Sequence, residues 1–66
     1  MGVKNKLLEI RLKMGYKNAK DFAEMLGLSS SMYSLIENNK RTVNLENAFL
    51  IAEKLNMKIE DIWYKD

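Results

Sequence analysis

The 66-residue chain contains no cysteine and no histidine. Disulfide bonds, thiolate or imidazole metal sites, and catalysis by either side chain are therefore excluded. Adjacent Glu60 and Asp61 cannot face each other on one helix, and no nucleophile has a plausible base beside it. We expect neither an enzyme nor a bound cofactor or metal.

Long hydrophobic runs are also missing, and the N-terminus lacks the apolar stretch of a signal peptide. We therefore expect a cytoplasmic protein that does not enter a membrane. Hydrophobic residues still make up 47% of the chain and charged residues 30%, a mixture that supports a packed core. A chain of this length forms one domain, which we expect to span residues 1–66.

Positive charge is concentrated in the first two thirds of the chain. Residues 1–45 contain eight Lys or Arg and four Asp or Glu, whereas residues 46–66 contain three and five. A basic N-terminal part suits a polyanion such as DNA, although solvated lysines on helix surfaces are the more ordinary explanation. Charge alone does not identify the partner.

Proline is absent too, and no segment alternates between apolar and polar residues as a half-buried strand would. The residue types that dominate favour helix over strand. Interruptions at Gly15, Gly27, Asn39 and residues 56–58 divide the chain into short pieces. We expect an all-α fold, a compact bundle of about five short helices.

The first two expected helices end at Gly15 and Gly27, which can adopt positive φ. The first covers residues 3–14, and its inward face consists of Val3, Leu7, Ile10 and Met14. The second begins at Asn18, whose side chain can cap the first turn, and Asp21 completes a pair similar to a capping box.

The third expected helix covers residues 30–38, with Leu28 buried before it and Ser29 as its N-cap. Asn39 ends it, because asparagine tolerates left-handed φ better than most residues. A fourth helix runs over residues 44–55 with the inward residues Leu45, Ala48, Phe49, Ala52 and Leu55. A last turn covers residues 59–63.

The second and third expected helices, joined by residues 27–29, form a helix-turn-helix arrangement. If Tyr33 and Ile36 face the core, the outward residues of the third helix are Ser30, Ser31, Ser34, Leu35 and Asn38. Short hydroxyl side chains let a helix lie deep in the DNA major groove, and a leucine can contact a thymine methyl group. A serine-rich helix start with one stray exposed leucine explains the same pattern.

Three stretches of the chain carry a resemblance to a known family. They are FAEMLGLS at residues 22–29, SLIENNKR at residues 34–41 and LENAFLIA at residues 45–52. Through them the chain resembles the phage-repressor/Cro-type (Xre-like) helix-turn-helix transcriptional regulators. The resemblance implies a lambda-repressor-like fold, a third helix in the major groove, and a homodimer on a near-palindromic operator in double-stranded DNA.

The resemblance also indicates which residues contact DNA. The positions that read bases fall on Ser30, Ser31 and Leu35, and those that contact phosphates fall on Asn18, Asn38, Lys40 and Arg41. The family commonly has glutamine at the position of Ala19, and we expect Lys20 or Lys17 to compensate for its loss. Asn39 replaces the usual glycine and Val43 the usual proline.

Two further features follow from the resemblance. It implies a largely buried ion pair between Arg11 and Glu37, which joins the first and third helices. Several apolar residues stand where the family tends to be polar or lie at the C-terminal end: Leu8, Leu12, Leu50 and residues 62–64. We expect Ile62 in the core and Trp63 and Tyr64 in a dimer interface, with Leu8 or Leu12 as further candidates. Scattered exposure explains them as well.

The leading prediction is a sequence-specific, double-stranded DNA-binding transcriptional regulator that represses by blocking polymerase. The alternative is a protein-interaction module, antitoxin-like or an adaptor, that docks through Met32, Leu35, Leu50 and Trp63. Salt-dependent affinity for DNA distinguishes the two functions.

Overall fold

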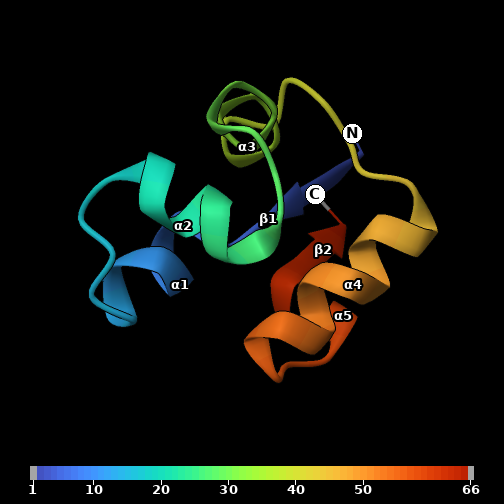
Figure 1. Cartoon of the computed structure of the whole chain (residues 1–66). Helices are drawn as coiled ribbons and strands as arrows, with labels where there is room; N and C mark the ends of the chain where they lie inside the picture. Colours follow the sequence, from blue (N-terminus) through green and yellow to red (C-terminus); the bar gives the residue numbers. More distant parts are fainter. Residues whose placement is uncertain (1, 66) are drawn as a thin grey trace.

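Five helices and two short strands make up residues 2–65, the part of the chain that the computed structural model describes (Figure 1). In chain order they are β1 (Val3–Asn5), α1 (Leu7–Lys13), α2 (Ala19–Leu26), α3 (Ser30–Glu37), α4 (Leu45–Leu55), α5 (Ile59–Ile62) and β2 (Trp63–Lys65). The predicted bundle of short helices is confirmed. Within residues 2–65, no helix has the length and apolar character needed to cross a membrane.

Side-chain caps fix the starts of three helices, as predicted. Each of these caps accepts a hydrogen bond from the backbone N–H three residues later, and they are Asn18, Ser29 and Asn44. Gly27, Asn39 and Asn56 follow the same helices with left-handed φ values of 80°, 60° and 55°. The local sequence therefore sets where α2, α3 and α4 begin and end.

One hydrophobic core holds the helices together. Its buried residues are Leu7, Ile10, Phe22, Ala23, Leu26, Tyr33, Ile36, Ile51, Ala52, Leu55 and Ile62. Phe22 lies between two other aromatic rings, with ring centroids 5.2 Å from Tyr16 and 5.4 Å from Tyr33. The tilted and edge-to-face orientations of these rings are the favourable ones for aromatic pairs. This packing anchors α3 to α2 and to the loop between α1 and α2.

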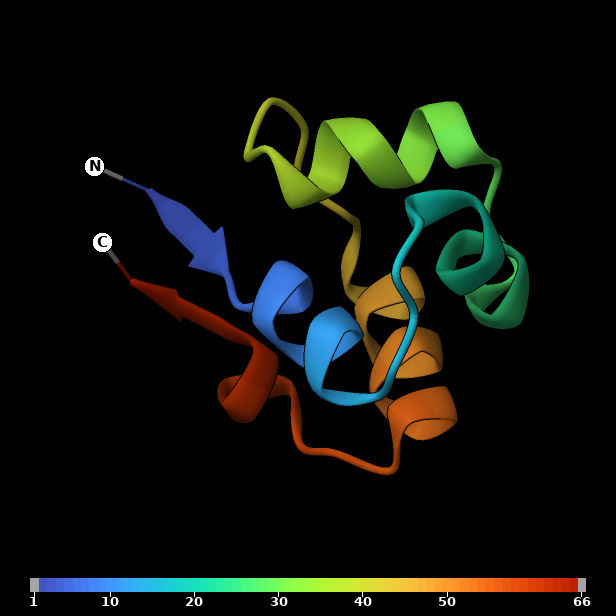
Figure 2. The same ribbon diagram turned by 90° about the vertical axis from the view of Figure 1, so that its left-hand side faces the viewer.

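The start of the chain differs from the prediction, because residues 3–5 form a strand instead of the first helical turn. β1 pairs antiparallel with β2, with Val3 opposite Lys65 and Asn5 opposite Trp63 (Figure 2). Three-residue strands are too short to show alternation, and their pairing depends on contact between the two ends of the folded chain. Val3 is consequently exposed rather than inward, and Met14, at the other end of the expected helix, is exposed as well.

The inward face of α4 was predicted only in part. Ala48, Ala52 and Leu55 are buried as expected, but Leu45 and Phe49 are 68% and 57% exposed. Ile51 is buried in their place. Apolar residues occur all around this helix, so the helical period alone does not determine which side faces the core.

Candidate nucleic-acid interface

α3 lies along one edge of the molecule, and the other helices lie to one side of it (Figure 2). Tyr33 and Ile36 point inward and are fully or almost fully buried. The opposite face carries the three predicted base-reading residues, and Ser30, Ser31 and Leu35 are all exposed. Leu35 is 40% exposed, so this face offers an apolar group as well as two hydroxyls. The face is therefore available to a partner.

The turn between α2 and α3 is tightly held. The Leu28 N–H donates to the Ala23 carbonyl at 2.8 Å, and the Ser29 hydroxyl accepts from the Met32 N–H at 3.1 Å. Leu28 packs against the core. Since hydrogen bonds and packing both fix the turn, α3 has a defined orientation on α2.

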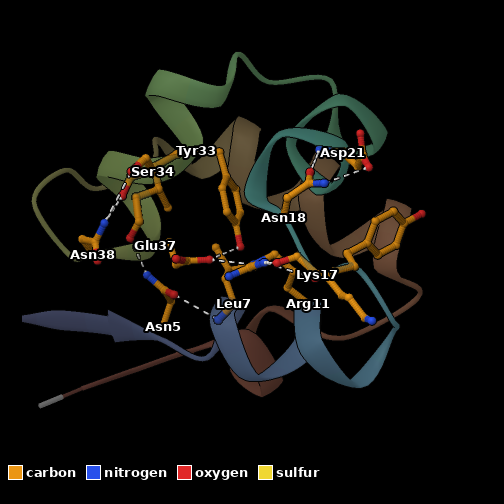
Figure 3. A network of polar contacts seen from close by, with 12 residues as sticks. Asn5, Leu7, Arg11, Lys17, Asn18, Asp21, Tyr33, Ser34, Glu37 and Asn38 are labelled. Carbon is orange, nitrogen blue, oxygen red and sulfur yellow. Dashed lines mark hydrogen bonds and ion pairs between the residues drawn. The ribbon is translucent and has the colours of Figure 1, made fainter.

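A buried ion pair holds the C-terminal end of α3 (Figure 3). The Arg11 Nε lies 3.1 Å from Glu37 Oε1, and the two side chains are only 10% and 13% exposed. Arg11 Nη1 also donates to the Tyr16 and Lys17 carbonyls, at 3.1 and 2.8 Å. The predicted pair is confirmed, and it joins α1, the loop before α2, and α3.

The Tyr33 hydroxyl completes this network by donating to Glu37 Oε1 at 2.7 Å. Burial, and next the hydrogen bond to the Glu37 carboxylate, raise the pKa of Tyr33 above its ordinary value. The phenol therefore stays protonated and keeps donating in alkaline as well as neutral solution. Glu37 thus accepts from Arg11 and Tyr33 together, which satisfies a carboxylate that the core largely encloses.

The turn after α3 carries three of the predicted phosphate-contacting residues, and Asn38, Lys40 and Arg41 are all exposed there. The Leu35 carbonyl accepts from the N–H groups of Lys40 at 2.9 Å and Arg41 at 3.2 Å. Asn38 Nδ2 donates to the Ser34 carbonyl at 2.9 Å. The amide of Asn38 is therefore partly engaged, whereas the two charged residues extend from a fixed backbone.

The other predicted phosphate-contacting residues, Asn18 and Lys20, lie at the start of α2 and are exposed. Asn18 uses both ends of its amide locally, because Oδ1 accepts from the Asp21 N–H and Nδ2 donates to the Asp21 carboxylate. One hydrogen bond of the capping pair thus joins a side chain to the backbone, and the other joins the two side chains. Of the two candidates Asn18 and Lys20, only Lys20 carries a positive charge for a phosphate.

Asn5 was not among the predicted site residues, yet it contacts the end of α3. Its Nδ2 donates to the Ile36 carbonyl at 2.7 Å. No local pattern pointed to this contact, because residue 5 fell inside an expected helix. The contact depends on the pairing of β1 with β2.

The residues predicted for a dimer interface lie in β2, on the terminal two-stranded sheet. Tyr64 is 42% exposed, with Lys6 Nζ at 5.8 Å from its ring centroid, whereas Trp63 is partly buried against the core. Leu8 and Leu12 are exposed on α1. The structure therefore leaves Tyr64 and the two leucines accessible and gives Trp63 a share in the core.

Comparison with models of protein families finds a match. A family model described as helix-turn-helix matches residues 7–62, from the first residue of α1 to the last residue of α5. Both terminal strands lie outside the matched range. No individual curated protein matches the chain.

Proposed function

The chain belongs to the Xre/lambda-repressor-like helix-turn-helix family of DNA-binding regulators, and we propose that α3 reads a specific sequence in the major groove. The observation that carries the proposal is the exposed outer face of α3 on a helix that Tyr33, Ile36 and Glu37 fix to the core. A rigid helix with short side chains can approach base edges closely.

Each residue of this face has a chemical role in the proposal. The hydroxyls of Ser30 and Ser31 donate to or accept from base edges, and Leu35 contacts a thymine methyl group. The flanking residues contact phosphates and fix the register, and they are Asn18, Lys20, Asn38, Lys40 and Arg41. We propose repression, by a protein that covers a promoter and blocks polymerase, as the regulatory outcome.

We predict steep salt dependence for the binding of DNA. An operator is first selected from a random pool of duplexes, and its affinity is then measured at increasing salt. The logarithm of the association constant should fall linearly with the logarithm of salt concentration, with a slope of about −0.9 for each phosphate contacted. Selection of no preferred sequence, or a slope near zero, would contradict the proposal.

We further propose that two copies bind a near-palindromic operator through half-sites about 34 Å, or one helical turn, apart. The exposed Tyr64 supports a dimer interface on the terminal sheet, whereas Trp63 is partly buried against the core. Sedimentation equilibrium should detect dimers at micromolar concentration or on operator DNA, and Tyr64→Asp should weaken them. Monomers alone under both conditions would refute this interface.

One observation favours a second function. Phe49 and Leu50 are consecutive on α4 and are 57% and 49% exposed. Large contiguous apolar patches on a surface are typical of protein-contact sites, and these two residues would form part of such a patch. A protein-interaction module would use this surface, together with Met32, Leu35 or Trp63, and its affinity for DNA would be absent or secondary. The salt titration separates the two functions.

A further inference from the structure

The Asn5 side chain joins three parts of the molecule that are distant in sequence (Figure 3). Its Oδ1 accepts from the Leu7 N–H at 3.0 Å, at the start of α1. Its Nδ2 donates to the Ile36 carbonyl at 2.7 Å and to Asn39 Oδ1 at 3.2 Å, at the end of α3. The amide thus links the terminal sheet, α1 and the turn after α3.

The two contacts of Nδ2 lie at the end of α3, where the chain enters the basic turn formed by Lys40 and Arg41. The Ile36 carbonyl accepts from the Asn39 N–H at 3.0 Å as well as from Asn5. The preceding carbonyl, that of Leu35, holds the N–H groups of Lys40 and Arg41. Two adjacent carbonyls at the end of α3 therefore organise the whole turn, and Asn5 binds one of them.

The residue before the basic turn supports the same link. Asn39 has a φ of 60°, a conformation for which glycine is the usual choice. Its Oδ1 accepts from Asn5 Nδ2, an interaction that glycine could not make. Asparagine at this position thus connects the turn to β1 while it tolerates the left-handed backbone.

The terminal sheet fixes the position of the Asn5 amide. Asn5 is opposite Trp63 in the antiparallel pair, and the Lys6 N–H donates to the Ile62 carbonyl at 2.8 Å. Trp63 packs against the core. Both ends of the chain therefore hold Asn5 in place beside the end of α3.

We propose that Asn5 is a positioning residue that sets the orientation of the turn carrying Lys40 and Arg41. Through Asn5, the terminal sheet thus influences how the Lys40 and Arg41 side chains contact DNA phosphates. The effect on DNA rests on the proposed function, whereas the effect on the turn exists in the free protein. The two are measured separately.

Two variants remove the Nδ2 donor of Asn5 and keep an oxygen that can accept from the Leu7 N–H. In Asn5→Asp the carboxylate still accepts from the Leu7 N–H but cannot donate to Ile36. Asn5→Ser keeps a capping oxygen without adding charge, and its hydroxyl is too short to reach Ile36. Ile51→Val serves as the control for a general loss of stability, because it removes one methyl group of α4 from the hydrophobic core. Melting curves establish that all three variants fold.

The first measurement is amide hydrogen exchange in the free protein. In both Asn5 variants the amides of Lys40 and Arg41 should exchange faster than they do in Ile51→Val. These amides donate to the Leu35 carbonyl at the end of α3, and in the Asn5 variants that end of the helix is no longer linked to β1. Unchanged exchange at these two amides would overturn the proposal, whether or not the protein binds DNA.

The second measurement is the salt titration on the selected operator. For Asn5→Ser we expect weaker binding and a log-log slope whose magnitude falls by about one unit for each phosphate that the variant no longer reaches. A slope equal to that of Ile51→Val would limit Asn5 to a structural role and overturn its part in DNA binding. Absence of salt-dependent binding by the unaltered protein would instead refute the proposed function, while the exchange measurement would still decide the effect on the turn.

Discussion

Replacing Arg11 with alanine should lower the free energy of unfolding by about 3 to 5 kcal/mol, because it leaves a buried carboxylate without its cation. Glu37 is 13% exposed and lies 3.1 Å from the Arg11 guanidinium. The carbonyls of Tyr16 and Lys17 lose their donors in the same step. A 66-residue domain has a total stability of roughly 3 to 10 kcal/mol, so we expect a large fraction of unfolded protein at room temperature.

Urea denaturation followed by circular dichroism measures this effect. Lys13→Ala is the matched control, because it removes a positive charge from an exposed position on the same helix. It should cost at most about 1 kcal/mol. A destabilisation by Arg11→Ala no greater than that of the control would show that the buried pair contributes little.

A double-mutant cycle separates the ion pair from the other interactions of Arg11. Glu37→Gln keeps an acceptor for the Tyr33 hydroxyl and removes only the charge. If the pair is the main contribution, the double variant should be destabilised by less than the sum of the two single effects. Strict additivity would assign the effect of Arg11→Ala to its hydrogen bonds with the Tyr16 and Lys17 carbonyls instead.

Features with a local signal were predicted correctly from the sequence. The N-caps Asn18, Ser29 and Asn44 and the left-handed residues after α2 and α3 are determined by the residue types at those positions. The inward pair on α3 follows from helical spacing. The Arg11–Glu37 pair followed from the resemblance to the family, because nothing local brings residues on separate helices together.

The features that the sequence did not reveal depend on contacts between distant residues. Pairing of β1 with β2 requires the folded bundle to bring the chain ends together, and the role of Asn5 follows from that pairing. The face of α4 was ambiguous because Phe49, Leu50 and Ile51 are consecutive and apolar. Only packing against the other helices selects Ile51 for the core.

The two faces of α3 differ in burial. Its inner face holds the helix through Tyr33, Ile36 and the ion pair of Glu37, whereas the residues of its outer face are exposed. Substitutions on the outer face should therefore change DNA binding without unfolding the protein.

We predict that Ser31→Glu weakens binding to the selected operator at least about a hundredfold, or roughly 2.7 kcal/mol. The substitution places an unpaired carboxylate in a groove lined by phosphates, where desolvation and repulsion both oppose binding. The same carboxylate should leave stability unchanged or slightly higher, because Ser31 lies in the first turn of α3 and a negative charge is favourable at a helix N-terminus. Opposite directions for affinity and melting temperature exclude unfolding as the cause.

Leu50→Glu is the matched control, because it adds the same charge at an exposed position on α4. If α3 reads the DNA, this variant should retain most of the affinity for the operator, as the added charge then lies outside the groove. Affinity and melting temperature are measured for both variants at the same salt concentration. Equal reductions in affinity for the two variants would point to net charge alone, and a reduction confined to Leu50→Glu would move the functional surface from α3 to α4.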